Sequence, residues 1–321
     1  MILGQDRAVS RFVEAMRSGA LHHAWLLGGP RGVGKASFAR EATRRLLAEA
    51  AGPPIALPGI ETPDKHPVAR LLAAGSHPDF RELVRLDRKE GGLARNISID
   101  QVRGLGELFN ATPFMSPWRA VVIDCADDLE PAAANALLKM LEEPPANCLF
   151  MLVTHAPGRL LPTIRSRCRR LDFQLLDDDA MTSDLGRCVP GQSEAETARM
   201  VAIAGGSAGR ALDFAALNLA PLEEAAIAIL RLGDPSNARR VKLAQGMSGK
   251  ASADRYAAFL ALVPSLIASE VRSLDGACRE RALDAYAQAR ESAAIARRLG
   301  LDPAATVFQL GGVLASVAPL P

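Results

Sequence analysis

The chain has 321 residues, a length that fits two or three domains, and 49% of its residues are hydrophobic, enough to build sizeable cores. Its net charge of +2 is not that of a typical nucleic-acid-binding protein, so any DNA contact would have to come from a local patch or from partner proteins. No apolar run approaches the roughly 20 residues of a membrane span. Asp6 and Arg7 interrupt any early signal-peptide core, and we expect a cytoplasmic protein with no membrane partner.

The chain begins with a predicted helix over residues 1–23, in which Val9 and Phe12 recur at helical spacing. A short apolar strand, 25–27, follows. After an intervening turn, apolar residues at helical spacing predict a second helix that extends to Leu47. This strand, turn and helix are the segment around which we interpret the rest of the sequence.

The turn reads Gly29-Pro30-Arg31-Gly32-Val33-Gly34-Lys35 and matches G-x-x-x-x-G-K. Such glycines let successive N–H groups face a polyphosphate, while the helix N-terminus and the lysine supply positive charge. The alternative is an ordinary glycine-rich turn. A complete motif continues with Ser or Thr as a Mg²⁺ ligand, but this chain has Ala36, and Ser37 is rotated by about 100° around the helix. Phosphate binding is therefore predicted, while metal-dependent chemistry is in doubt. The candidate nucleotide-binding residues here are Gly29, Gly32, Gly34, Lys35, Ala36 and Ser37.

A Pro/Gly-rich insertion over residues 50–78 separates this segment from a predicted strand at 80–84. Asp100 is expected to cap the helix that follows. The next element is a continuous apolar run, 120–123, closed by Asp124. Such a run is typical of a buried parallel strand.

An acid at the carboxyl end of this strand, Asp124, lies where a nucleotide-bound Mg²⁺ would be. A hydrolysing site has Glu at the next position, but this chain has Cys125, which cannot act as the same base for water. Asp127 and Asp128 lie beyond the strand end, and we expect them to face solvent. The sequence thus keeps parts of a binding apparatus and lacks two parts of a catalytic one.

A helix over 131–143 is expected to end before the Pro144-Pro145 pair, and a buried strand, 148–153, follows it. At its tip Thr154 carries a hydroxyl that can reach toward a γ-phosphate. A short basic helix and a last strand at 171–175 complete the alternation of strands and helices. We therefore predict an α/β domain over residues 1–175, with a parallel sheet covered by helices on both faces.

The stretch Ala132-Ala133-Ala134-Asn135-Ala136-Leu137-Leu138-Lys139-Met140-Leu141-Glu142-Glu143-Pro144-Pro145, followed by Ser166-Arg167-Cys168, resembles the signature of the bacterial clamp-loader branch of the AAA+ ATPases. His77-Pro78-Asp79 and Ile99-Asp100-Gln101-Val102-Arg103 support the resemblance. It implies a P-loop AAA+ domain that takes ATP or ADP with Mg²⁺. Many relatives carry a four-cysteine zinc module, but residues 48–96 contain no cysteine, so we predict no zinc or other metal ion held by this chain alone. The five cysteines are dispersed, an odd count that indicates reduced thiols rather than disulfides. They are Cys125, Cys148, Cys168, Cys188 and Cys278.

In the family, the arginine of the Ser-Arg-Cys motif is a finger that enters the ATP site of the neighbouring subunit, so the resemblance makes Arg167 the candidate catalytic residue. The role requires a fixed and always charged donor fork, which Arg provides better than Lys. The alternative is a surface arginine within a basic stretch that also holds Arg165, Arg169 and Arg170.

Residues 176–218 are predicted to form a small helical lid, in which the family uses an arginine to sense nucleotide. Arg210 matches that position; the alternative is a charged first-turn residue in solvent. Residues 219–321 carry apolar stripes at helical spacing and predict an all-α bundle, which in the family is a collar that holds the subunits together.

The resemblance implies a stator subunit of a clamp loader, which assembles with gamma/tau-type ATPase subunits and a delta-type subunit. Through the assembled complex it would meet the sliding clamp and primed DNA. Two rivals remain open: an active ATP-hydrolysing motor subunit, against which Ala36 and Cys125 count, and a free-standing nucleic-acid-binding module, against which the net charge counts. Whether nucleotide binds in the degenerate site is left open by the sequence.

Overall fold

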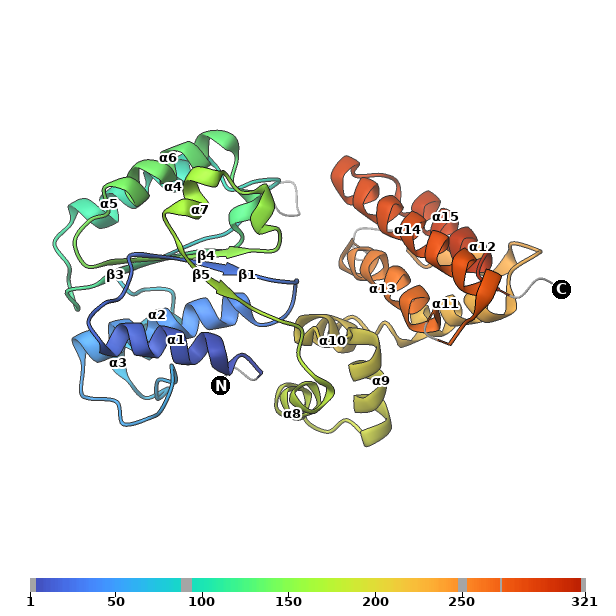
Figure 1. Ribbon diagram of the computed structural model, residues 1–321, viewed down its shortest axis with the longest axis horizontal. Helices are drawn as coiled ribbons and strands as arrows, with labels where there is room; N and C mark the ends of the chain where they lie inside the picture. Colours follow the sequence, from blue (N-terminus) through green and yellow to red (C-terminus); the bar gives the residue numbers. More distant parts are fainter. Residues whose placement is uncertain (1–3, 88–93, 248–252, 272, 319–321) are drawn as a thin grey trace. The chain divides into compact units, whose positions relative to one another are not determined.

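The computed structural model describes residues 4–87, 94–247, 253–271 and 273–318 (Figure 1). The chain divides into two compact units, Met1–Asp177 and Asp178–Pro321. Among the described residues of the first unit, five strands form one parallel sheet in the order β2-β3-β4-β1-β5, which confirms the predicted parallel α/β sheet. The strands are β1 (Ala24–Gly28), β2 (Phe80–Leu83), β3 (Arg119–Ile123), β4 (Cys148–Thr154) and β5 (Arg169–Asp172).

Helices cover both faces of this sheet (Figure 1). One face carries α1 (Asp6–Arg17), α2 (Lys35–Ala51) and α3 (Pro67–Ala73), and the other carries α4 (Ile99–Arg103), α5 (Leu105–Asn110), α6 (Pro131–Glu142) and α7 (Pro162–Ser166). Successive strand residues point to opposite faces. Within β1, for example, Trp25 and Leu27 belong to the core under α1 and α2, whereas Leu26 belongs to the core under α6. Since β1, β3 and β4 are buried along their whole length, they read as continuous apolar runs.

Three element boundaries differ from those expected from the sequence. The first helix ends at Arg17, because Gly19 with φ +69° breaks the helical path. The cap of α4 is Ser98 and not Asp100: the Ser98 hydroxyl accepts from the Gln101 N–H, and the Gln101 side chain accepts from the Ser98 N–H. The last strand begins at Arg169, since residues 169–172 pair with β1, and ends at Asp172.

The described residues of the second unit form helices. They are α8 (Asp178–Cys188), α9 (Glu194–Ala204), α10 (Ala208–Ala216), α11 (Ala220–Leu232), α12 (Ala238–Gln245), α13 (Ala253–Val271), α14 (Gly276–Leu299) and α15 (Pro303–Ala315). The predicted C-terminal helical bundle is confirmed, and α15 begins at Pro303, a residue that suits a first helical position. Helices α8, α9 and α10 pack on one another, and α9 and α10 also contact α13. The division into a lid, 176–218, and a collar, 219–321, stays a prediction.

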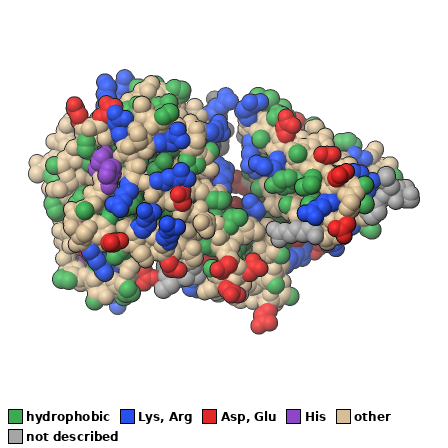
Figure 2. All heavy atoms as spheres, viewed as in Figure 1, with side chains coloured by type: hydrophobic (Ala, Val, Ile, Leu, Met, Phe, Trp, Pro, Cys, Tyr) green, Lys and Arg blue, Asp and Glu red, His purple; other side chains and the backbone are tan. Residues whose placement is uncertain are grey.

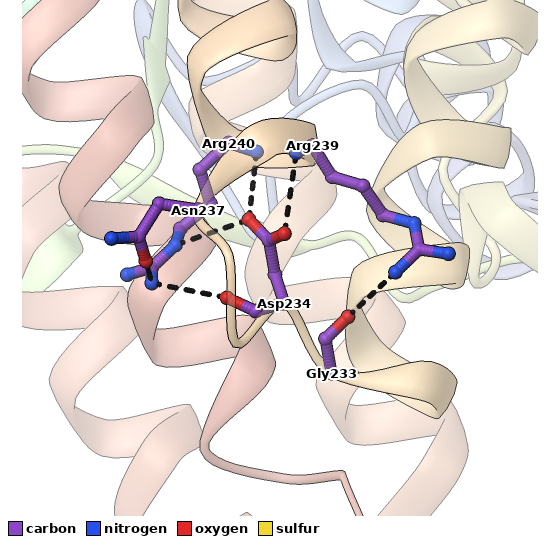
Figure 3. A network of polar contacts seen from close by, with 5 residues as sticks. All are labelled: Gly233, Asp234, Asn237, Arg239 and Arg240. Carbon is purple, nitrogen blue, oxygen red and sulfur yellow. Dashed lines mark hydrogen bonds and ion pairs between the residues drawn. The ribbon is translucent and has the colours of Figure 1, made fainter.

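A buried carboxylate, Asp234, organises the turn between α11 and α12 (Figure 3). Its oxygens accept hydrogen bonds from the N–H groups of Arg239 (3.2 Å) and Arg240 (2.9 Å), which lie in the first turn of α12. Asp234 therefore satisfies donors that have no partner within the helix. The Arg240 guanidinium also binds this carboxylate and lies over the ring of Phe308 on α15, so one network ties α11, α12 and α15 together. None of the helices in the described ranges combines the length and apolar character needed to cross a membrane.

Candidate nucleotide-binding site

The glycine-rich turn joins the carboxyl end of β1 to the N-terminus of α2, as the sequence predicts. Gly32 and Gly34 have φ of +74° and +92°, values that side-chain-bearing residues rarely adopt. At Gly29 a Cβ would lie 2.3 Å from the carbonyl oxygen of Phe173, so the close approach of the two backbones also requires glycine. These three glycines therefore give the turn the curled backbone of a phosphate-binding loop.

Lys35 is 3% exposed and lies within this loop. Its Nζ donates to the carbonyl oxygen of Gly29 (2.6 Å) and to that of Pro30. Burial lowers the pKa of Lys35 to about 8, although the nearby acidic groups work in the opposite direction. The residue after it, Ala36, offers no oxygen, and Ser37 is exposed. The loop thus has its lysine in place and lacks the hydroxyl that would ligate Mg²⁺.

Asp124 follows β3 and is ion-paired with an arginine of α2 that the sequence analysis did not single out. The Nη2 of Arg40 lies 3.1 Å from the carboxylate of Asp124, and its Nε lies 2.8 Å from that of Glu82 on β2. Burial raises the pKa of Asp124, while the charge of Arg40 opposes that rise. The acid predicted to face a metal ion therefore already faces a cation of its own chain.

The expectation that Asp127 and Asp128 face solvent is wrong. Asp127 accepts hydrogen bonds from the Thr154 hydroxyl (2.7 Å), the His155 N–H (2.6 Å) and the Cys125 thiol (2.9 Å), and so it links the ends of β3 and β4. Burial by itself would raise the pKa of Asp127, but these hydrogen bonds lower it. Asp128 pairs with Arg85 at 3.2 Å. Both acids are half-buried.

The hydrogen bonds to Asp127 also determine the surroundings of Thr154 and Cys125. Thr154 is fully buried, and its hydroxyl is held by Asp127. Burial and the adjoining Asp127 raise the pKa of Cys125 to about 12, so this thiol stays protonated near neutral pH. It cannot serve as a general base, which agrees with the sequence argument on the missing glutamate.

Cys125, Asp127 and His155 also bring three potential metal donors within 4.8 Å of one another. Asp127, however, already accepts the three hydrogen bonds described above. Burial and the positive charges of Lys35 and Arg31 lower the pKa of His155 to about 4. Because the Asp127 carboxylate is already engaged by these hydrogen bonds, we explain the cluster as a hydrogen-bond hub next to a phosphate loop.

Gln5 connects the loop to the start of α1 and to the segment after β5. Its side-chain amide donates to the carbonyl oxygens of Val33 (3.4 Å) and Gln174 (2.8 Å). A cavity of about 240 Å³ lies beside it. The lining residues are Gly4, Gln5, Arg7, Ala8, Arg11, Leu171, Asp172 and Gln174.

Arg167 lies at the C-terminal end of α7, apart from the loop. Its Nη2 is 2.8 Å from the carboxylate of Glu142 at the end of α6, and its Nη1 donates to the carbonyl oxygen of Thr163 (3.0 Å). The guanidinium remains about one-third exposed. The structure thereby brings together the two motifs on which the family resemblance rests, because Glu142 belongs to the first and Arg167 to the second.

Arg210 lies in α10 of the second unit. Its Nη1 donates to the Ser265 hydroxyl on α13 (2.8 Å), and its own N–H donates to the Ser207 hydroxyl, which caps the helix (3.3 Å). Its expected role in sensing nucleotide stays a prediction.

Sequence reasoning missed Arg40, Glu82 and Glu142. Each acts through a partner far away in the chain, and no local pattern distinguishes Arg40 from the other arginines of α2. Glu142 lies inside the quoted motif, but nothing local in the sequence pairs it with Arg167.

The family described as "DNA polymerase III, delta subunit" matches residues 4–177, more than half of the chain. The delta' subunit of DNA polymerase III from Pseudomonas aeruginosa is 34% identical over 185 residues, 58% of this chain and 53% of that protein. The gamma/tau subunit from Mycobacterium tuberculosis is 33% identical over 186 residues, 58% of this chain and 30% of that protein. The chain therefore spans about half the length, or less, of these curated relatives.

Among solved structures, a DNA polymerase III gamma-subunit-related protein from Thermotoga maritima is similar along 95% of this chain and 98% of its own, with a TM-score of 0.50 and 16% identity. At that identity the likeness shows the fold alone.

Proposed function

Because the chain belongs to the family of DNA polymerase III delta subunits, we propose that it acts as the delta'-type stator subunit of a clamp loader. In this proposal it assembles with gamma/tau-type ATPase subunits and a delta-type subunit in the cytoplasm. The assembled complex meets the sliding clamp and primed DNA, and ATP or ADP is the ligand of the phosphate loop. The chain itself does not hydrolyse ATP.

The observation that carries the proposal is the arrangement of Arg167. The guanidinium is held from one side by Glu142 and Thr163 and stays partly exposed, so it can reach a group outside this chain. A fixed, permanently charged fork is what stabilises the charge that develops on a γ-phosphate. We therefore assign Arg167 as an arginine finger supplied to a neighbouring ATPase subunit.

The stator role follows from what the chain's own site lacks. Ala36 stands where a Mg²⁺ ligand is needed, and Cys125, a protonated thiol, stands where the water-activating carboxylate is needed. The glycines and Lys35 keep the loop suited to phosphate. Binding without hydrolysis is the function that this combination supports.

The test is steady-state ATP turnover by the assembled loader with Arg167→Ala. Turnover is expected to fall by the contribution of the site that Arg167 serves, because a missing finger costs about 10³-fold or more at one site. Arg165→Ala, which changes an exposed arginine on the same helix, is the matched control and should leave turnover unchanged. Normal turnover by an intact Arg167→Ala complex would remove the finger assignment.

An active motor subunit is the rival that the loop glycines and Lys35 favour. ATP turnover by the purified chain, measured with Mg²⁺ and primed DNA, separates the stator from the motor subunit. A wild-type rate that disappears in Lys35→Ala would establish an active site in this chain. The nucleic-acid-binding alternative has less support, because the net charge of the chain is only +2. On the face that Figure 2 shows, Lys and Arg side chains are numerous on the first unit, with Asp and Glu side chains among them.

A further inference from the structure

Besides Lys35, the proposed nucleotide site has a second cationic side chain, Arg40, beside the acid that follows β3. Arg40 lies on α2, one turn and a half after Lys35, and its guanidinium bridges two carboxylates from neighbouring strands. Its Nη2 lies 3.1 Å from Asp124 and 2.7 Å from Glu82. Burial by itself would lower the pKa of Arg40, but these two acids raise it, so the charge is permanent. The position beside Asp124 is therefore occupied by positive charge.

The residues present do not fit Mg²⁺. This ion demands nearly octahedral oxygen coordination and usually takes one or two carboxylates together with phosphate oxygens. Ala36 supplies no oxygen, and Ser37 is exposed on another side of the helix. One carboxylate oxygen of Asp124, Oδ2, is already paired with Arg40.

The surroundings nevertheless suit a polyphosphate. Helix α2 begins at Lys35, directly after the loop, and no side chain caps its N-terminus, so its first N–H groups are available to an anion. In an ordinary site Mg²⁺ would compensate both the phosphates and the acid at the strand end. Here Arg40 already compensates the acid.

We propose that Arg40 takes the place of the divalent cation beside Asp124, so that this loop binds ATP or ADP without Mg²⁺. The inference rests on the phosphate loop as a nucleotide site, which is part of the proposed function, and is independent of the role of Arg167. It also gives a structural reason for binding without hydrolysis. A nucleotide held without a metal ion lacks the charge stabilisation that phosphoryl transfer requires.

The experiment is a calorimetric titration of the full chain with ATP, once with excess MgCl₂ and once with excess EDTA. The two dissociation constants are expected to agree within about threefold, since no ligand of the ion is gained or lost. In Arg40→Gln the uncompensated Asp124 repels the phosphates, so binding in EDTA is expected to weaken by about tenfold, the loss expected for a charge-assisted contact. Mg²⁺ should restore much of it.

Two variants keep this result interpretable. Arg44 lies one turn further along α2 and pairs with Glu41 and Asp64. Arg44→Gln should therefore leave ATP binding unchanged in both buffers. Arg40→Lys keeps a positive charge next to Asp124 and should keep binding independent of Mg²⁺. Circular dichroism melts of every variant show whether the fold is retained.

Electron paramagnetic resonance of Mn²⁺ reads the metal directly. With ATP and Mn²⁺, the wild-type chain should not alter the Mn²⁺–ATP spectrum beyond the effect of nucleotide binding, whereas Arg40→Gln should produce a protein-bound signal that Asp124→Asn removes. Wild-type ATP binding that needs Mg²⁺, a wild-type Mn²⁺ signal lost in Asp124→Asn, or unchanged Arg40→Gln would each overturn the proposal. Absence of ATP binding in either buffer would also overturn it, and would leave the Arg167 experiment on the assembled loader standing.

Discussion

The guanidinium of Arg167 lies 2.8 Å from the carboxylate of Glu142, so residues from two separate sequence motifs form one ion pair on the surface of the first unit. The side chains are 35% and 47% exposed, respectively. A pair this exposed contributes little to folding, at most about 1 kcal/mol. Its consequence is instead geometric, because it restricts the directions in which the Arg167 fork can point.

Glu142→Gln should therefore lower ATP turnover by the assembled loader while changing the unfolding free energy of the isolated chain by less than about 1 kcal/mol. Loss of a contact that orients Arg167 and is worth about 0.5–1 kcal/mol corresponds to a two- to fivefold decrease in the rate of ATP hydrolysis at the site that Arg167 serves. Glu143→Gln, the adjoining exposed acid, is the control and should have no effect. A Glu142→Gln loader with full turnover would show that the pair does not position Arg167.

Nucleotide affinity should depend on pH through Lys35. Burial lowers its pKa to about 8, and only the ammonium form attracts phosphate. ATP binding measured by calorimetry in EDTA is expected to be strongest between about pH 7 and 8, where the phosphates are ionised and Lys35 is protonated, and to weaken by up to about tenfold per pH unit above pH 8, as the proton is lost. For folding the sign is opposite: the unfolded chain binds this proton more tightly, so stability rises with pH between about 8 and 10.5.

Lys35→Met is the control for this titration. It should bind ATP more weakly at every pH and show no further decrease above pH 8. The same decrease in Lys35→Met would assign the pH dependence to another group.

Asp127 should matter for stability more than its neighbour Asp128. Asp127→Ala leaves the Thr154 hydroxyl, the His155 N–H and the Cys125 thiol without their acceptor, and we expect the unfolding free energy to fall by about 2–3 kcal/mol in urea titrations. Asp128→Ala breaks a single, partly exposed pair with Arg85 and should cost at most about 1 kcal/mol. Equal effects of the two substitutions would contradict the hub assignment.

The pH dependence of this effect has a definite sign. Because its hydrogen bonds depress the pKa of Asp127, its stabilisation is present above the ordinary carboxyl pKa of 3.8 and is lost as the pH falls through the lower folded value. The difference between wild type and Asp127→Ala should therefore shrink at acid pH.

The parallel sheet and its helices could be predicted because they depend on local patterns. The buried strands are continuous apolar runs in the sequence. The glycine-rich turn lies between a predicted strand and a predicted helix, and its glycines indicate the positive φ values that the structure has. The motif His77-Pro78-Asp79 is explained only by the structure. The buried Asp79 carboxylate accepts from the N–H groups of Phe114 (2.8 Å) and Met115 (2.8 Å), far along the chain.

The parts that could not be predicted are contacts between side chains that are distant in sequence. Asp127 was expected in solvent because it follows a strand, yet its carboxylate completes hydrogen bonds at the tip of β4. Likewise, nothing in the sequence around Arg40 announces its two acidic partners, since they come from β2 and the end of β3. Local reasoning identifies which residues a site lacks, whereas the tertiary structure shows what replaces them.

The Asp234 network gives the sharpest prediction for the second unit (Figure 3). Asp234→Ala removes a carboxylate whose side chain is 1% exposed and leaves the Arg239 and Arg240 N–H groups and the Arg240 guanidinium without it. Loss of a helix cap and of a buried acceptor should lower the unfolding free energy by about 2–4 kcal/mol.

Asp234→Asn keeps one oxygen acceptor and loses the charge, so it should cost about half as much. Burial by itself would raise the pKa of Asp234, but the N–H groups of Arg240 and Arg239 and the Arg240 side chain lower it. The advantage of wild type over Asp234→Asn is thus expected to persist from neutral pH down to about pH 4 and to disappear below it. Urea unfolding at neutral and acid pH measures both differences, with Asp284→Asn, an exposed acid on α14, as the control within about 0.5 kcal/mol of wild type. If Asp234→Ala unfolds like the Asp284→Asn control, the network contributes nothing to the packing of α12 against α11 and α15, and the apolar contacts between these helices alone determine their arrangement.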